Sequence, residues 1–150
     1  MSDDKNKRNF KVQNNLFFEI ITDDLKNGKS VKFNVSGKSM VPFLNHGDQV
    51  VVKQPSDLDV KKGDILLFKY QGKFILHRLI KIKGPKYYLA GDGNLDQIEI
   101  IEKEDVIGMV TGGSRGDELL KVSSNFNKKL GLMWYYIRPL RYLFSKFKKV

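Results

Sequence analysis

Residues 35–44 read VSGKSMVPFL, and residues 47–52 continue with GDQVVV. This stretch predicts a strand, a tight turn and a second strand, because a β-type run ends at Gly37 and a Gly-Asp pair opens the next run. Pro42 fixes its own φ and prevents helix around it. Ser39 is therefore expected on a rigid corner, where a nucleophile gains most from being held in place. Taken alone, the pattern also fits an ordinary β-turn that contains a serine.

The chain around this corner is patterned for strands. Short runs rich in Val, Ile, Phe and Tyr alternate with Gly, Pro, Asn and Asp, which predicts a mainly β fold, a small barrel-like or sandwich-like body. Gln71-Gly72 predicts a hairpin, and Gly47-Asp48 and Gly63-Asp64 predict turns that each start a strand. The predicted strands are Val31–Ser36, Gln49–Lys53, Asp64–Tyr70, Lys73–Lys81, Tyr87–Ala90, Val106–Thr111 and Leu119–Val122.

Helical patterns flank the β body. Phe10–Asn27 carries apolar residues at helical spacing, with Gly28 as a stop, and predicts a helix that packs on the body or touches a membrane or substrate. Asn127–Val150 predicts a second helix with one broad apolar side, kinked or split at Pro139. The expected organisation is a disordered lead (residues 1–9), one folded domain (10–127, beginning with the helix 10–27) and a basic amphipathic tail (128–150).

The composition limits the classes of site. With 41% hydrophobic and 29% charged residues, the 150-residue chain has the balance of an ordinary soluble domain. Cysteine is absent and histidine occurs only twice, which argues against disulfides, thiol catalysis and a multi-histidine metal site. We therefore expect no cofactor and no metal. The polar start of the chain does not resemble a secretory signal, so we expect a cytoplasmic protein, with a peripheral position at the inner membrane face as the alternative.

The net charge of +10 is unevenly distributed. Seven basic residues and no acidic residue lie in 128–150, which leaves +3 for residues 1–127. A basic, aromatic-rich tail favours contact with an anionic membrane surface. The alternatives are a helix docked on the body and a contact with nucleic acid. We do not expect a nucleic-acid partner, because such proteins usually spread basic residues over a folded face.

A serine nucleophile needs a base and donors for the oxyanion that forms. The sequence offers His77 within ILHRLI (75–80) as the base, and Asp92 within GDGN (91–94) as a group that could orient it. A lone histidine in an apolar strand is more often structural than catalytic. The residues alone therefore allow a Ser-His-Asp arrangement without selecting it.

Four segments in order resemble the signal-peptidase and self-cleaving-repressor superfamily of serine peptidases. GKSMVPFL (37–44) with Gly47-Asp48 is similar to its nucleophile box, GDILLF (63–68) to the strand that follows, ILHRLI (75–80) to its general-base box and GDGN (91–94) to its acidic box. The match extends over about residues 35–112. It implies a mainly β peptidase fold with a peptide or protein substrate, and a preference for signal- or leader-like sequences.

The resemblance also implies roles for individual residues. Ser39 would be the nucleophile, His77 the base, and Asp92 the third member, with Asp96 as the alternative. The main-chain N–H of Ser39 would hold the oxyanion. Some relatives add a hydroxyl two residues before the nucleophile, where this chain has Gly37, and Ser36 is one residue farther away. Substrate would add as a β-strand beside Val35 and Ser36, and the expected oxyanion and substrate-binding set is Val35, Ser36, Gly37, Ser39, Met40 and Pro42.

Two other functions fit the same boxes. One is a catalytically silent peptide-binding module, which the missing hydroxyl at Gly37 favours. The other is a self-cleaving repressor. The repressor fits less well, because no Ala-Gly or Cys-Gly pair precedes Ser39 and the residues before it leave no room for a DNA-binding domain.

Overall fold

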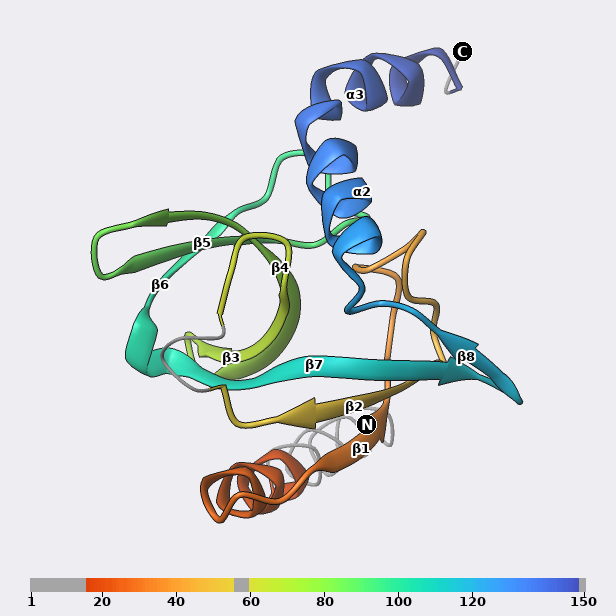
Figure 1. The fold of residues 1–150 in the computed structure, drawn as a ribbon. Helices are drawn as coiled ribbons and strands as arrows, with labels where there is room; N and C mark the ends of the chain where they lie inside the picture. The colour runs from red at the N-terminus through yellow and green to blue at the C-terminus, as the bar shows by residue number, and fades with distance from the viewer. Residues whose placement is uncertain (1–15, 56–59, 149–150) are drawn as a thin grey trace, which may run out of the picture.

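The computed structural model describes residues 16–55 and 60–148. Its strands are antiparallel throughout and form one curved sheet in the order β1-β2-β7-β3-β4-β5-β6, with β8 paired to β7. The strands are β1 (Val31–Asn34), β2 (Gln49–Lys53), β3 (Ile65–Tyr70), β4 (Lys73–Lys83), β5 (Lys86–Ala90), β6 (Glu99–Glu102), β7 (Val106–Arg115) and β8 (Glu118–Leu120), with a 3-10 helix η1 (Lys103–Asp105) before β7. The fold is thus mainly β with helices near both ends, as predicted (Figure 1).

All predicted strands are present, with bounds that move by a few residues. The predicted hairpin joins β3 to β4: Gln71 and Gly72 both have positive φ, as a two-residue type I′ turn requires. Strand β6 was not predicted, because a glutamate stands at each end of its short apolar core. Strand β6 carries Glu99, a residue of the candidate site.

Strand β3 lies at the centre of the core. Its first four residues are all buried: Ile65 and Leu67 pack into one hydrophobic cluster, and Leu66 and Phe68 into a second one on the other face. A strand buried on both faces reads as a continuous apolar run, which explains the sequence ILLF. The sheet therefore curves around two cores, and the candidate site lies at the edge of the first.

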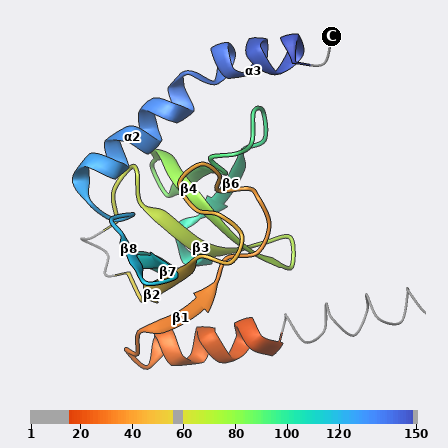
Figure 2. The same cartoon turned by 90° about the vertical axis from the view of Figure 1, so that its right-hand side faces the viewer.

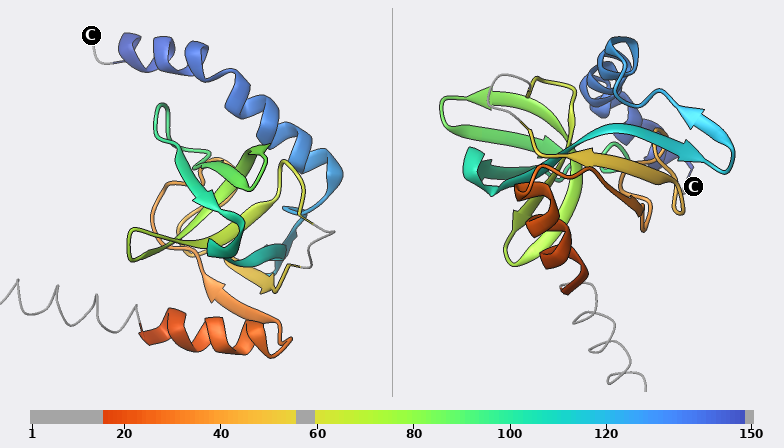
Figure 3. Two further views of the ribbon diagram at one scale, coloured as in Figure 1. Left: turned by 90° about the vertical axis from the view of Figure 1, so that its left-hand side faces the viewer. Right: turned by 60° about the horizontal axis from the view of Figure 1, so that its bottom comes forward.

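The N-terminal helix, described over residues 16–26, covers β1 and β2 (Figures 2 and 3). Ile21 and Leu25 are buried in the first core, while Leu16 and Ile20 remain exposed. Gly28, with φ of +80°, ends the helix and its N–H donates to the Leu25 carbonyl. The helix thus packs on the body. The predicted disordered lead and the predicted first residues of this helix lie outside the described part of the chain.

The predicted turns at Gly47-Asp48 and Gly63-Asp64 are present, and both are stabilised by the same hydrogen-bond pattern. Each glycine has positive φ, and the carboxylate of Asp48 or Asp64 accepts the main-chain N–H three residues earlier. A cation then binds each carboxylate: Arg115 donates two hydrogen bonds to Asp48, and Lys128 Nζ lies 2.7 Å from Asp64. Hydrogen bonds from Arg115 hold the pKa of Asp48 below its ordinary value.

The predicted C-terminal helix is split, one of the two outcomes expected at Pro139. α2 (Asn125–Tyr136) begins at Ser124, whose side chain accepts the Asn127 N–H, and α3 (Arg138–Phe147) begins with Pro139 in its first turn. Both helices lie on the side of the sheet opposite the N-terminal helix, and α3 extends beyond the strands (Figures 1 and 2). No helix in the described residues has the length and apolar content needed to cross a bilayer.

A buried ion pair joins the sheet to α2. Arg78 of β4 donates two hydrogen bonds to the carboxylate of Asp92, in the loop after β5, and a third to the Gly63 carbonyl. The guanidinium lies over the Phe43 ring, 4.9 Å from its centroid, and a Cβ on Gly131 of α2 would come within 2.2 Å of its central carbon. Burial raises the pKa of Asp92, and its hydrogen bonds to Arg78 act in the opposite direction.

We predict that Arg78→Met lowers the free energy of unfolding by about 3–5 kcal/mol, because it leaves the Asp92 carboxylate buried without a partner. The double variant Arg78→Met/Asp92→Leu should recover part of this loss, since neither charge remains. Urea denaturation measures both effects. A loss below about 1 kcal/mol in Arg78→Met would contradict a structural role for the pair.

Candidate active site

Ser39 lies in the turn that connects β1 to β2. Val35 before the serine and Met40 and Leu44 after it are all buried in the first core, so the turn is anchored on both sides of the serine. The Gly37 N–H donates to Nδ1 of His46 at 3.0 Å, a cross-turn contact that the sequence did not suggest. Ser39 itself is half-buried. The corner is therefore anchored by packing, while its serine stays partly accessible.

His77 points inward from β4 and is only 4% exposed. Its Nδ1 lies 2.9 Å from Oε2 of Glu99, which is itself 1% exposed and accepts a second hydrogen bond from Gln97 on Oε1. The Phe68 ring packs edge-on against the imidazole. A carboxylate at Nδ1 selects the tautomer with its proton on Nδ1, which leaves the Nε2 lone pair free to accept a proton.

The loop after β5 brings the free nitrogen of His77 against the serine turn. A Cβ placed on Gly91 would lie 2.9 Å from His77 Nε2 and 2.6 Å from the Ser39 carbonyl oxygen. The Gly93 N–H donates to the same carbonyl at 2.8 Å, and a Cβ on Gly93 would lie 2.6 Å from the Lys38 carbonyl oxygen. Only glycine fits at these two positions, because the backbones approach so closely. The glycines of GDGN therefore bring the base close to the serine turn.

Ser39, His77 and Glu99 line one hollow of about 480 Å³. Its walls are mostly apolar, with polar groups near the serine and the histidine; they also include Phe18, Phe33, Asn34, Val35, Ser36, Met40, Leu67, Phe74, Ile75, Leu76, Asn94 and Gln97. Among the described residues, no hydrogen bond joins Ser39 Oγ to His77. Catalytic hydrogen bonds are often long or poorly aligned in the absence of substrate, so Ser39 and His77 stay a candidate pair on the strength of the hollow they share.

The acid behind His77 differs from the expected one. Asp92 was expected there, with Asp96 as the alternative, but both Asp92 oxygens are engaged by Arg78, and Asp96 is exposed. Glu99, the first residue of the unpredicted β6, occupies the position instead. The sequence contained one signal for Glu99, an acidic residue that directly precedes two apolar residues of a short strand. A carboxylate in such a position is costly to bury without a partner.

The other predicted residues divide into two groups. Val35, Ser36 and Met40 line the hollow together with Ser39, whereas Gly37 and Pro42 do not. Gly37 has φ of +86° and its N–H is used by His46, so it shapes the turn. The Ser39 N–H donates to no acceptor within residues 16–55 and 60–148, which leaves it available to an oxyanion.

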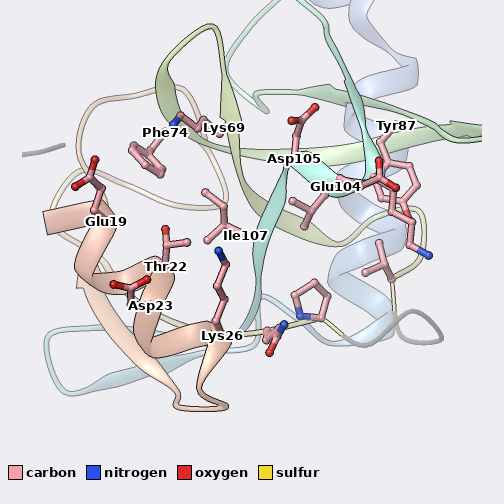
Figure 4. Close-up of a pocket in the computed structure, with 15 residues that line it drawn as sticks. Glu19, Thr22, Asp23, Lys26, Lys69, Phe74, Tyr87, Glu104, Asp105 and Ile107 are labelled. Carbon is pink, nitrogen blue, oxygen red and sulfur yellow. The ribbon is translucent and has the colours of Figure 1, made fainter. Parts of the chain in front are cut away.

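A larger hollow of about 740 Å³ lies elsewhere, between the N-terminal helix, β3 and the start of β7 (Figure 4). Glu19, Asp23 and Lys26 of the helix line one side, and Glu104 and Asp105 line the other. It contains neither Ser39 nor His77, and its charges are mixed, so it has no constellation for nucleophilic chemistry. The described residues also contain no group of three or more His, Asp or Glu side chains arranged to hold a metal ion.

One comparison with known proteins identifies a family. No curated protein matches the chain in sequence. The family model described as Peptidase S24-like matches residues 2–111, which include Ser39, His77, the GDGN loop and Glu99. This family lies in the superfamily of signal peptidases and self-cleaving repressors that the four sequence boxes resemble. The chain therefore belongs to the Peptidase S24-like family of serine peptidases and self-cleaving repressors.

Proposed function

We propose that the protein is a serine endopeptidase that cleaves signal- or leader-like peptides, with Ser39 as nucleophile, His77 as general base and Glu99 as the residue that positions the base. The observation that carries this proposal is the buried His77–Glu99 hydrogen bond, which leaves Nε2 facing the serine turn. A histidine ring that is held by a buried carboxylate and lines the same hollow as Ser39 is placed to act as its base.

In this mechanism His77 Nε2 removes the proton from Ser39 Oγ as the oxygen attacks the peptide carbonyl carbon. The Ser39 N–H stabilises the oxyanion of the tetrahedral intermediate. The imidazolium then protonates the leaving amine, which leaves an acyl-serine, and water activated by the same histidine hydrolyses that ester. Glu99 holds the ring in position and stabilises its charged form, as the carboxylate of a triad does.

The proposed substrate is an extended peptide, because two open strand edges border the hollow. Within residues 16–55 and 60–148, β1 ends the sheet and pairs with β2 alone, and the first half of β4 pairs with β3 alone, since β5 joins from Arg78 onward. Phe33 and Val35 contribute one wall of the hollow, and Phe74 and Leu76 contribute the other. A peptide added as a strand there would satisfy the free backbone groups. We expect apolar side chains to fill the hollow and small ones to flank the cut.

A catalytically silent peptide-binding module remains the second candidate. Two observations favour it: no side-chain hydroxyl stands at Gly37, and Ser39 Oγ is not hydrogen-bonded to His77 within the described chain. The same edges would bind the same extended peptide, so the two functions differ only in turnover.

We predict that the purified protein cleaves members of a synthetic peptide library with small residues at varied positions, and that Ser39→Ala abolishes this cleavage. His77→Ala should lower kcat/KM by about 10³-fold, because it removes the general base. Mass spectrometry identifies the products, and circular dichroism verifies that both variants are folded. Cleavage that persists in Ser39→Ala would refute the assignment. Peptide binding without turnover would support the silent module.

We predict that Glu99→Gln lowers kcat by about 10²–10⁴-fold with little change in KM, because the substrate edges are untouched while the imidazolium loses its charged neighbour. Asp96→Asn is the matched control and should retain wild-type kinetics, since Asp96 is exposed. Steady-state kinetics on a cleaved peptide measure both. Wild-type kcat in Glu99→Gln, or a loss confined to Asp96→Asn, would show that the acid is misassigned.

A further inference from the structure

One face of α3 is apolar and exposed. Leu140, Leu143, Phe144 and Phe147 recur at intervals of three and four residues, so they form one stripe along the helix, and they are 56%, 51%, 66% and 69% exposed. Met133 and Tyr136 of α2 are also exposed near the point where α3 begins. Four adjacent large apolar side chains on one helix face exceed the scattered exposure that is normal for a soluble domain.

The inner face of the same helix is held by arginines. Arg138 is only 8% exposed and donates to the Gln97 carbonyl, and Arg141 donates to the Asp92 carbonyl at 2.6 Å. Trp134 of α2 donates to the same Asp92 oxygen, and the Arg141 guanidinium lies over the Trp134 ring, 4.1 Å from its centroid. A helix docked on a globular body normally buries its apolar side. Here the contacts to the body are polar, and Leu140 and Phe144 line a hollow of about 440 Å³ beside Arg141, so the stripe stays exposed although the helix is held in place.

The positive charge around the stripe indicates which kind of surface it binds. Residues 125–148 contain six basic residues and no acidic one. Lys146 and Lys148 are exposed on α3 and Lys129 on α2, and aromatic residues are frequent in both helices. Basic and aromatic residues around an apolar stripe are the features of a helix that lies in the plane of a membrane interface. A second copy of this chain would bring two strongly basic segments together, which costs free energy.

We propose that the α3 stripe, formed by Leu140, Leu143, Phe144 and Phe147, docks the protein in the interface of an anionic lipid bilayer. The stripe would insert among the acyl chains near the headgroups, while the exposed lysines bind anionic headgroups. The contacts of Arg138 and Arg141 to the 92–97 loop would hold the hollow of Ser39 at a fixed position relative to the bilayer. This last consequence rests on the proposed function; the lipid binding itself does not.

The test is co-sedimentation of the full chain with vesicles of phosphatidylcholine alone and of phosphatidylcholine with phosphatidylglycerol. We expect binding to the anionic vesicles, weaker binding as salt is raised, and little binding to the neutral ones. Leu140→Ser/Leu143→Ser should lower the partition coefficient at least about tenfold, because each leucine loses most of its transfer free energy. Leu16→Ser/Ile20→Ser is the matched control: these residues are 58% and 55% exposed on the N-terminal helix, and the control should partition as wild type does.

Other results would overturn the proposal. The proposal is wrong if the wild type does not bind anionic vesicles, or if wild type and Leu140→Ser/Leu143→Ser partition equally. It is also wrong if the wild type does not bind lipid but forms a dimer in light scattering that becomes a monomer in the same double variant. Because all four substituted residues are exposed, thermal melts should show that both double variants fold normally. Ser39→Ala should bind vesicles as wild type does, so loss of peptidase function and loss of lipid binding are distinguishable.

Discussion

The structure depends on one buried ion pair, Arg78 with Asp92. The two charges satisfy each other in a place that excludes water, and Arg78 also binds the Gly63 carbonyl and stacks on Phe43. The main-chain oxygen of Asp92 in turn accepts hydrogen bonds from Trp134 and Arg141. A buried charge pair of this kind specifies arrangement more than it adds stability. It positions the GDGN loop, and through Gly91 and Gly93 that loop brings the serine turn close to His77.

This constraint explains why the sequence located the site but misplaced one of its members. Ser39, His77 and the glycine-rich loop follow from the order of the boxes and from the strand pattern, and the structure gathers them at one hollow. The partner of Asp92 could not be read from sequence, because it depends on which face of β4 turns toward the loop: Arg78 and His77 are adjacent and point to opposite sides. With Asp92 taken by Arg78, the acid for His77 comes from β6, a strand too short and too acidic to be recognised in advance.

The orientation of the C-terminal helices also depends on contacts that the sequence does not reveal. Helical spacing identified the apolar side of residues 127–150 and the break at Pro139, but amphipathicity alone does not say which side faces the body. Arg141 binds the Asp92 carbonyl and, together with Arg138, holds α3 on the body through polar contacts, which leaves the apolar stripe exposed. Hydrogen bonds to the loop of the candidate site thus decide the orientation of the surface that we assign to lipid.

We propose that Glu99 fixes His77 so that its Nε2 lone pair faces Ser39. Long-range ¹H–¹⁵N correlation spectroscopy of the uniformly labelled protein tests it directly, and His46→Asn assigns the signals, because the chain has only two histidines. At a pH where the ring is neutral, we predict the His77 proton on Nδ1 and a bare Nε2, and Glu99→Ala should mix the two tautomers. A proton on Nε2 in the wild type would contradict the account, because His77 could not then accept the serine proton.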